Sequence, residues 1–324
     1  MTIRRAMLCP ACVMLAMAGS VAAQDAATPA AKPADAPADA PAETSDAPEV
    51  SFRVGGFGIY HFKSDLDKNG DVSLSRAGGE VGVNIPFGKT VFLDVAFREE
   101  ASWYNFSNAV DLGGTDSPWD GPLYDHRLIS SLFVRHNDNW SWIVAGSVAW
   151  SHEDSSASDS MTGGGVGLVT YSFNDSFALS AGVSASARLE RSARIVPIIS
   201  IDWKINDAWR LSGRGVGRLA NRGPGLALLY SPNETWTFGV GASYETREWR
   251  LDDEGVAPDG IAEDSRLPIE FSAVWKPSKR LSLTGTIGVD AWAEYSLYDK
   301  NGDRIGDVQA DPTPFVGIEA KVMF

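Results

Sequence analysis

The sequence is poor in cysteine and histidine, the residues on which disulfides, thiolate chemistry and many metal sites depend. Only two of its 324 residues are cysteine, Cys9 and Cys12, and only four are histidine. Because both cysteines stand near the start of the chain, the rest has no thiol for a disulfide, a thiolate nucleophile or a sulfur-ligated metal. After the first 23 residues there is also no run of about 18 apolar residues, the length a membrane-spanning helix needs. If this chain crosses a bilayer, it does so with strands.

Basic residues are also scarce. The chain has 28 Lys and Arg against 42 Asp and Glu, a formal net charge of −14. Residues 50–324 alone carry 25 basic and 36 acidic side chains, a net charge of −11. An acidic surface repels the phosphate backbone, so we expect no nucleic-acid partner.

The first 23 residues have the organisation of a secretory signal peptide. A basic pair at 4–5 precedes an apolar run over 6–18, and Val-Ala-Ala at 21–23 supplies small residues for cleavage. This pattern is typical of a segment removed on export and differs from a spanning helix.

Residues 24–49 consist mainly of alanine, proline and acids. Such a composition has too little apolar surface to form a core, so we expect a disordered periplasmic linker. The remaining residues, 50–324, are enough for one large domain.

From residue 50 onward, apolar and polar residues alternate in about fourteen segments, each long enough to be a strand. We predict strands at roughly 50–63, 72–85, 89–104, 125–136, 140–151, 163–173, 177–189, 193–205, 209–219, 225–231, 236–249, 266–275, 281–297 and 314–324. Alternation with a period of two places one face of each strand in an apolar environment and the other in a polar one. Pro197 lacks a backbone donor and indicates a bulge in its segment.

The connections between these segments alternate in length. Every second one is a tight turn rich in Gly, Pro, Asn and Asp, whereas the others are mostly longer and acidic, as at 105–124, 152–162, 250–265 and 298–313. Short turns on one side and long loops on the other are typical of outer-membrane barrels. With an even number of strands, both termini fall on the short-turn side, the periplasm. A soluble β-sandwich is the alternative, but it rarely separates loop lengths in this way.

Four of the tight turns share the pattern Asn-(Asp/Glu)-x-aromatic. They begin at Asn137, Asn174, Asn206 and Asn233, and each places a Trp or Phe at the start of the next strand. These aromatics share the phase of the apolar face, so we predict that they form a ring at one headgroup boundary. The alternative is ordinary capping of hairpins by core aromatics.

The last segment, residues 314–324, alternates most regularly. Its apolar positions are Val316, Ile318, Ala320, Val322 and the terminal Phe324. A final strand of about ten residues that ends in Phe resembles the closing strand of Gram-negative outer-membrane β-barrels. The resemblance is to that broad architecture, with no subfamily identified. It implies a bacterial outer-membrane location, contact with lipid and lipopolysaccharide, and recognition of this strand by the barrel assembly machinery.

The fold prediction is therefore an all-β protein: a transmembrane, antiparallel, up-and-down β-barrel of about 14 strands with both termini in the periplasm. With the apolar phase facing lipid, the other phase faces the lumen. The predicted lumen residues are Arg53, Arg188, Arg194, Arg210, Arg214, Arg218, Glu245, Asp290, Glu294 and Glu319. The spacing of Arg210, Arg214 and Arg218 on one strand face suggests that these three line a conducting path.

The lumen charges permit two interpretations. An arginine-rich wall opposite a carboxylate-rich one would set a field across a water-filled pore, as in a porin-like channel for passive diffusion of small hydrophilic solutes. Alternatively, the charges pair across the lumen and fill it. The second case would suit a non-conducting structural or surface-binding barrel that acts through its acidic loops. Barrels of 8 strands are filled and those of 16–18 are open, so fourteen lies between.

The loop after the first strand matches the start of an EF-hand calcium loop. Its candidate ligands are Asp65, Asp67, Asn69 and Asp71. Position twelve is Arg76 instead of the bidentate Glu, and the alternative is a simple Asn-Gly turn. Calcium is the only cofactor that the sequence suggests.

The spacing of the Ser, His and acidic residues does not indicate a catalytic site. Ser151 and His152 are adjacent, and neighbours on a strand point to opposite faces, so they are poorly placed to share a proton. A lipid-modifying barrel enzyme is thus the least favoured function, and we predict no catalytic residues.

Overall fold

The computed structural model describes residues 49–324 except 120, 154–158 and 214–222. The predicted signal peptide, nearly all of the predicted linker, and both Arg214 and Arg218 lie outside the described residues.

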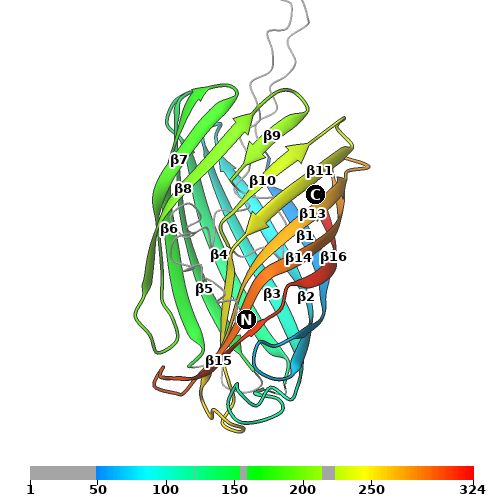
Figure 1. Ribbon diagram of the computed structural model, residues 1–324. Coiled ribbons are helices and arrows are strands. Elements are labelled where there is room, and N and C mark those ends of the chain that lie inside the picture. The colour runs from blue at the N-terminus through cyan, green and yellow to red at the C-terminus, as the bar shows by residue number, and fades with distance from the viewer. Residues whose placement is uncertain (1–48, 120, 154–158, 214–222) are drawn as a thin grey trace, which may run out of the picture.

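The described residues form strands joined by turns and loops (Figure 1). The strands are β1 (Ser51–Asp65), β2 (Asp71–Phe87), β3 (Val91–Ser107), β4 (Leu123–Arg135), β5 (Trp140–His152), β6 (Met161–Asn174), β7 (Phe177–Ser186), β8 (Arg194–Lys204), β9 (Trp209–Ser212), β10 (Gly225–Tyr230), β11 (Trp236–Ser243), β12 (Glu245–Arg250), β13 (Ile261–Trp275), β14 (Leu281–Tyr298), β15 (Arg304–Ala310) and β16 (Thr313–Met323). Within the described residues, no helix is long and apolar enough to cross a membrane.

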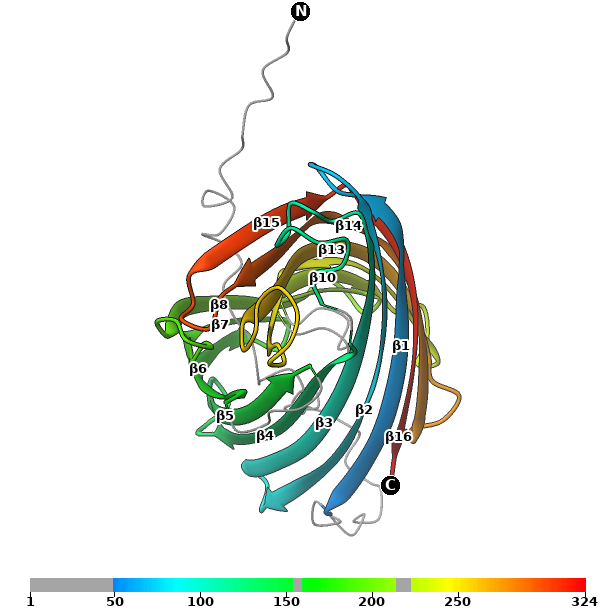
Figure 2. The ribbon, with the colours of Figure 1, turned by 90° about the horizontal axis from the view of Figure 1, so that it is seen from below.

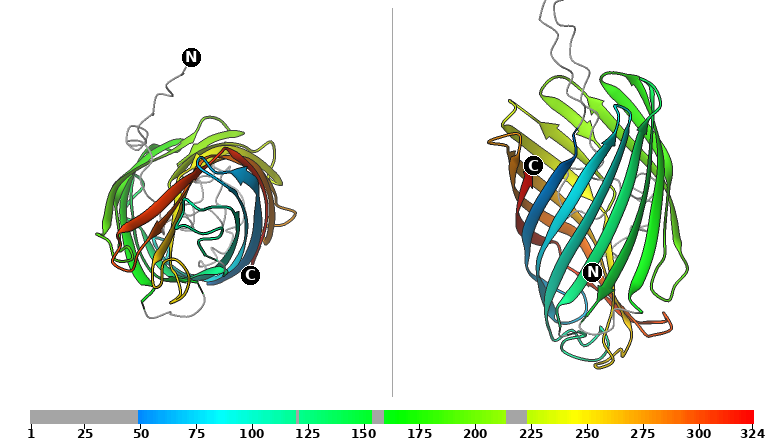
Figure 3. Two further views of the ribbon diagram at one scale, coloured as in Figure 1. Left: turned by 60° about the horizontal axis from the view of Figure 1, so that its bottom comes forward. Right: turned by 180° about the vertical axis from the view of Figure 1, so that it is seen from behind.

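These strands make one closed antiparallel barrel (Figures 1 and 3). β11 and β12 follow each other along the same neighbour, β13, and β15 and β16 do the same along β14, so each pair counts as one barrel strand. The ring has 14 barrel strands and closes where β1 pairs with β16. The predicted all-β barrel and its strand number are confirmed.

The predicted tight turns all lie at one end of the barrel, here called the turn end; the opposite end is the loop end. In the turns that contain it, the repeated Asn stabilises the turn. The Asn206 side-chain oxygen accepts the backbone N–H groups of Ala208 (2.9 Å) and Trp209 (3.0 Å), and Asn137 and Asn233 do the same in their turns. Asn side chains stabilise turns in this way because they replace a backbone acceptor.

The aromatics that follow these turns lie together. Ring centroids are 4.8 Å apart for Trp140 and Tyr171, 4.8 Å for Trp209 and Tyr230, and 6.2 Å for Trp236 and Trp275. The predicted belt of aromatics at one depth is therefore present near the turn end.

The outward face of the barrel is apolar and exposed. Ile199 is 74% exposed, Ile195 70% and Ile318 68%. In a monomer surrounded by water, so much exposed apolar surface would cause aggregation, whereas lipid is its natural solvent.

A bulge interrupts this pattern on three adjacent barrel strands toward the loop end. From His61 to Ser64, β1 advances by three residues while its partner β2 advances by two. From Asp290 to Ala293, β14 advances by three residues while its partner β13 advances by two. The connection between β15 and β16 advances by as many residues as β14 over this stretch, so it has the same extra residue. An extra residue reverses which side chains point inward.

The reversal is clear on β14. Its odd-numbered residues Ile287 (58% exposed) and Val289 (40%) point outward before the bulge, while Tyr295 (3%) and Leu297 (0%) point inward beyond it. The loop end of these strands thus has apolar residues inside and polar residues outside, as a water-soluble barrel does.

Pro197 causes no bulge, contrary to the prediction. It pairs in register with Val183 on β7, and β9 pairs with β8 only at residues 202–204. Its missing N–H falls on a stretch of β8 with no described ladder on that side, where a proline is tolerated.

Candidate functional site

The candidate site is the barrel interior, and its first feature is a belt of paired charges on β1–β3. Arg53 forms ion pairs with Glu80 and with Asp94, and Arg98 forms one with the other oxygen of Glu80. Arg53, Glu80 and Asp94 are all buried. Arg53 lies among these buried carboxylates, and its charge is neutralised by them.

A second set of pairs crosses the lumen. Arg247 of β12 donates to Glu100 of β3 (3.0 Å), and Arg76 of β2 donates to Asp264 of β13 (3.1 Å). Tyr104 donates to the same carboxylate at 2.5 Å. These side chains are nearly inaccessible to solvent, so each charge is stabilised only by its partners.

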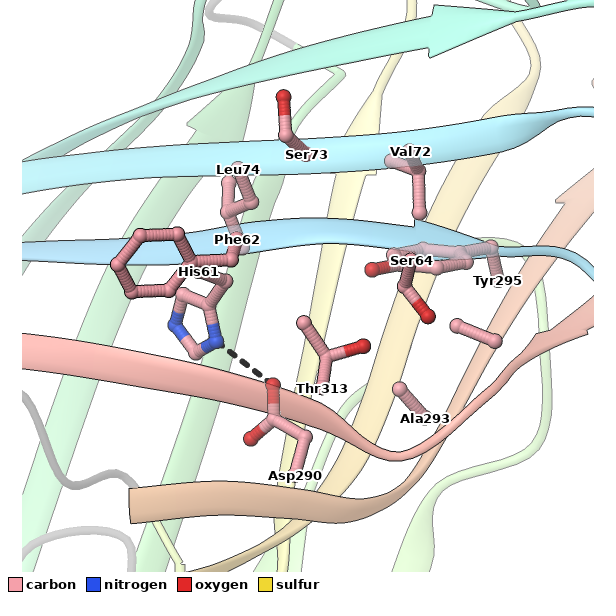
Figure 4. Close-up of a pocket in the computed structure, with 11 residues that line it drawn as sticks. His61, Phe62, Ser64, Val72, Ser73, Leu74, Asp290, Ala293, Tyr295 and Thr313 are labelled. Carbon is pink, nitrogen blue, oxygen red and sulfur yellow. Dashed lines mark hydrogen bonds and ion pairs between the residues drawn. The ribbon is translucent and has the colours of Figure 1, made fainter. Parts of the chain in front are cut away.

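Asp290 joins the same network from β14. It accepts a hydrogen bond from Arg266 (2.8 Å) and lies 2.6 Å from the Nδ1 atom of His61. Figure 4 shows the contact between His61 and Asp290. Arg266 also donates to Asp264, so the network is continuous between β2 and β14.

Beyond this network, toward the loop end, the interior is an apolar core. It contains aromatic and aliphatic side chains of the strands and of the long loops. Its members are Leu66, Val72, Leu74, Tyr104, Phe106, Ala109, Leu112, Trp119, Leu123, Trp249, Leu251, Ala257, Ala262, Ala293, Tyr295, Leu297, Val308 and Ala310. Tyr104 stands at its centre, with its ring within 6.0 Å of Phe106, Trp119, Trp249 and Tyr295.

Glu153 ties the loop end of this core together. Its side chain accepts the backbone N–H of Gly121 (3.0 Å) and that of Asp252 (3.3 Å), and its own N–H donates to the carbonyl of Arg250 (2.8 Å). Arg250 pairs in parallel with His152, which joins β12 to β5. Glu153 is 5% exposed, and its hydrogen bonds hold three segments of the chain together.

The wall formed by β6–β11 differs. Its inward-facing positions carry mostly small side chains: Gly164, Ser180, Gly182, Ser184, Ser200, Ser212, Ala227, Gly239 and Gly241. Near the turn end, Asp202 and Arg210 form an ion pair between β8 and β9 and keep 37% and 40% of their side chains exposed. On β4–β8 an inward apolar cluster includes Phe133, Ile143, Leu168 and Ile198, so the interior is not uniformly polar.

The other predicted lumen residues fall in different places. Glu245 and Glu319 face inward and are buried, and Arg194 is the first residue of β8. Arg188 lies past the end of β7, because that strand stops at Ser186 instead of residue 189. Arg210 faces inward, whereas its two predicted companions lie outside the described residues, so the three-arginine path stays a prediction.

Glu294 is a correction. It is paired with Arg304 (2.7 Å) on the face opposite to the buried Tyr295, so its predicted inward orientation is wrong. The bulge after Asp290 is the reason, since it inverts every position that follows.

Sequence reasoning missed most of the cross-lumen network. Glu100, Arg76, Asp264 and Arg266 were not among the predicted lumen residues. Charged residues two apart on a strand, such as Asp264 and Arg266, are a usable signal, because both then occupy the same face.

The predicted calcium ligands are not gathered around one point. Asp71 pairs with Lys63 (2.8 Å), Asp67 accepts the N–H of Gln309 (2.9 Å), and Asn69 donates to Asp111 (3.0 Å). Across the described residues, no group of three or more His, Cys, Asp or Glu is arranged to hold a metal ion. Calcium binding remains a prediction.

Ser151 and His152 point to opposite faces, as predicted. Ser151 donates to the buried carboxylate of Asp125 (2.7 Å), while the His152 ring lies 5.6 Å from that of His126. A proton transfer between Ser151 and His152 is not supported by this geometry.

Comparison with known proteins gives distant structural likenesses only. No protein-family model matches the chain, and no curated protein matches it. An outer-membrane channel from Pseudomonas putida F1 is similar over 88% of this chain and all of its own, with 12% identity and a TM-score of 0.46. The toluene transporter TodX of P. putida is similar over 85% of this chain and 90% of its own (8% identity, TM-score 0.43). The KdgM porin covers 83% of this chain and 99% of its own (8% identity, TM-score 0.34). At these identities no residue role passes from those proteins to this chain.

Proposed function

We propose that this chain is a bacterial outer-membrane channel through which small hydrophilic solutes diffuse passively. The observation that carries the proposal is a closed 14-strand ring whose outward face is exposed and apolar, while its inward face holds solvated charges at Asp202 and Arg210. An apolar exterior requires lipid, and an ion pair that is more than one-third exposed inside a ring requires water there.

The same proposal assigns the partners. Lipid chains contact the apolar belt, lipopolysaccharide surrounds the loop end, and the assembly machinery reads the C-terminal strand. The inverted faces beyond the bulge support it, because polar outward residues such as Glu294 and Arg304 suit an aqueous or headgroup environment.

A second function has one observation in its favour. The apolar core and the buried ion pairs fill the loop end between β1–β5 and β12–β15. A barrel filled over its whole section would be a non-conducting surface-binding protein that acts through its acidic loops.

Single-channel recording separates the two functions. The chain from residue 24 onward is refolded in detergent and added to a planar lipid bilayer, with heat-unfolded protein as the control. We expect discrete conductance steps with the folded protein only. Stable insertion without conductance, at any applied voltage, favours the non-conducting barrel.

A further inference from the structure

The contact between β5 and β12 divides the barrel at its loop end. The two strands pair through His152 and Arg250, and the Glu153 N–H donates to the Arg250 carbonyl at 2.8 Å. Around the wall, five barrel strands (β6–β10) separate β5 from the barrel strand that contains β12. A contact between strands so far apart means that β12 leaves the wall and crosses the interior. Seen from the loop end, the connection after β12 (yellow) indeed lies inside the ring, with β6–β8 (green) beyond it (Figure 2).

On one side of the contact, nine barrel strands surround the apolar core. These are β1–β5 and those containing β12, β13, β14 and β15. A ring of about eight strands is just wide enough for side chains to fill it, whereas much larger rings leave a channel. Leu297, Leu123 and Val308 are 0% exposed here, and the ion pairs between β2–β3 and β12–β13 run directly beneath them. The described side chains therefore fill this ring at the level of the core.

On the other side, β12–β13 and β6–β8 bound the rest of the ring, and we call the region between these strands the crevice. Because β12 has moved inward, its outward face is turned toward the inward face of those strands. That outward face is polar: Thr246, Glu248, Glu263 and Ser265 occupy it, and Ser265 donates to Thr246 at 3.2 Å. A charged side chain on a lipid-facing position is destabilising, most of all near the membrane centre. Two glutamates on this face are consistent with a surface that faces water within the protein.

Two arginines from the β7–β8 connection meet these glutamates. Arg188 contacts Glu248 at 2.6 Å and Glu263 at 2.8 Å, and Arg191 contacts the same carboxylates at 3.1 Å and 2.8 Å. The four side chains are 12–19% exposed, so they are neither fully buried nor free in solvent. The Arg191 guanidinium also lies 3.9 Å from the centre of the Tyr298 ring, which fixes its position.

We infer that solutes cross the loop half of this barrel through that crevice, and that Arg188, Arg191, Glu248 and Glu263 form its charged constriction. The inference rests on the proposed channel function. Rings of charged side chains set the ion selectivity of pores. Two positive and two negative groups cancel, so the intact channel discriminates little between anions and cations.

Charge-removing variants test the selectivity. The double substitution E248Q/E263Q leaves two uncompensated arginines and is expected to shift the anion-to-cation permeability ratio upward about threefold or more; R188Q/R191Q is expected to shift it the opposite way. The control is K63Q/D71N, which removes an ion pair of the same kind (2.8 Å) on β1–β2, outside the crevice. If the wild type conducts and both double variants match it, the inference is wrong.

Thiol labelling tests the route by a readout that needs no conductance. The chain after residue 23 has no cysteine, so single cysteines can be introduced without background. Thr246→Cys lies on the crevice face and Ala262→Cys in the nine-strand core, where Ala262 is 0% exposed. A hydrophilic thiol reagent is expected to label folded Thr246→Cys and to reduce its conductance, and to leave folded Ala262→Cys unlabelled.

The outcomes distinguish the two proposals. If the reagent labels Ala262→Cys and reduces its conductance but does neither to Thr246→Cys, the route runs through the core and the inference is overturned. If no variant conducts but Thr246→Cys is still labelled, the crevice is water-filled and the channel function fails. If neither conducts nor labels, both fail. Unheated gel mobility of each variant confirms that it has folded.

Discussion

At the scale of single residues, a few side chains stabilise the backbone in a way that their exposure or charge alone does not reveal. Glu153 connects three segments of the loop end, and Asn206 replaces a backbone acceptor in a two-strand turn. Both act by accepting backbone N–H groups, which are costly to leave unpaired when shielded from water.

We predict that Glu153→Ala lowers the free energy of unfolding by about 1–3 kcal/mol, because two shielded backbone donors lose a charged acceptor. Urea unfolding of the lipid-refolded barrel measures it. Glu254→Ala is the control, since Glu254 is exposed in the neighbouring loop. Equal midpoints for the two variants contradict the role given to Glu153.

Asn206→Ala is expected to cost about 1 kcal/mol, because the N–H groups of Ala208 and Trp209 exchange a fixed acceptor for water. Asn206→Asp keeps an oxygen in the same place and should retain most of the stability. The same unfolding assay applies. A loss as large in the Asp variant as in the Ala variant would show that the side-chain oxygen is not what stabilises the turn.

At the scale of elements, the bulge across β1, β14 and the β15–β16 connection is the main feature. It exchanges the two faces of three adjacent strands, so that one strand is suited to lipid over part of its length and to water over the rest. The boundary between the two environments is therefore set by local backbone geometry as well as by residue type.

A lysine on the outward face should report this boundary. Ile287→Lys, on the lipid side of the bulge, is expected to lower stability in a bilayer by about 2–4 kcal/mol, whereas Gln309→Lys, outward but beyond the bulge, should be nearly neutral. Reversible urea unfolding in lipid vesicles gives both values. A similar cost at the two positions would mean that the membrane extends past the bulge.

At the scale of the whole molecule, closure of the ring depends on the C-terminal strand. Phe52 and Phe324 exchange two backbone hydrogen bonds (3.1 and 2.9 Å), and the Phe324 side chain, 65% exposed, contributes little to the interior. The Phe324 backbone closes the barrel, and its phenyl group is accessible to a partner.

We therefore predict that Phe324→Ala folds nearly normally in detergent but accumulates less in the outer membrane of cells. Backbone pairing survives the substitution, whereas it removes the terminal aromatic side chain that we propose the assembly machinery reads. Refolding yield on unheated gels and the amount in outer-membrane fractions are the two measurements. Equal losses in both would assign the ring a structural role instead.

Much of the architecture was predictable because it depends on local sequence patterns. Alternation along each segment located the barrel strands except β15 and the start of β13, which lie within the predicted loops 298–313 and 250–265. The Asn-containing turns indicated which ends of the strands lie at the turn end. The alternation of Val316, Ile318 and Ala320 against Glu319 matches the exposure of those side chains in the barrel. Each of these features depends on neighbours within one strand or one hairpin.

The interior was less predictable, because it depends on residues that are far apart. Arg247 and Glu100 are 147 positions apart, and nothing local to either indicates that they meet. Glu294 was misplaced because alternation fits either phase of β14, and only pairing with β13 reveals the inserted residue.

The sequence by itself determined that this chain forms a closed barrel of strands with an apolar exterior, since periodicity and turn chemistry are local properties. Only the tertiary structure decided how the interior is divided. The contact between β12 and β5 reduces fourteen strands to nine at the loop end, and a ring of that size is filled by its own side chains.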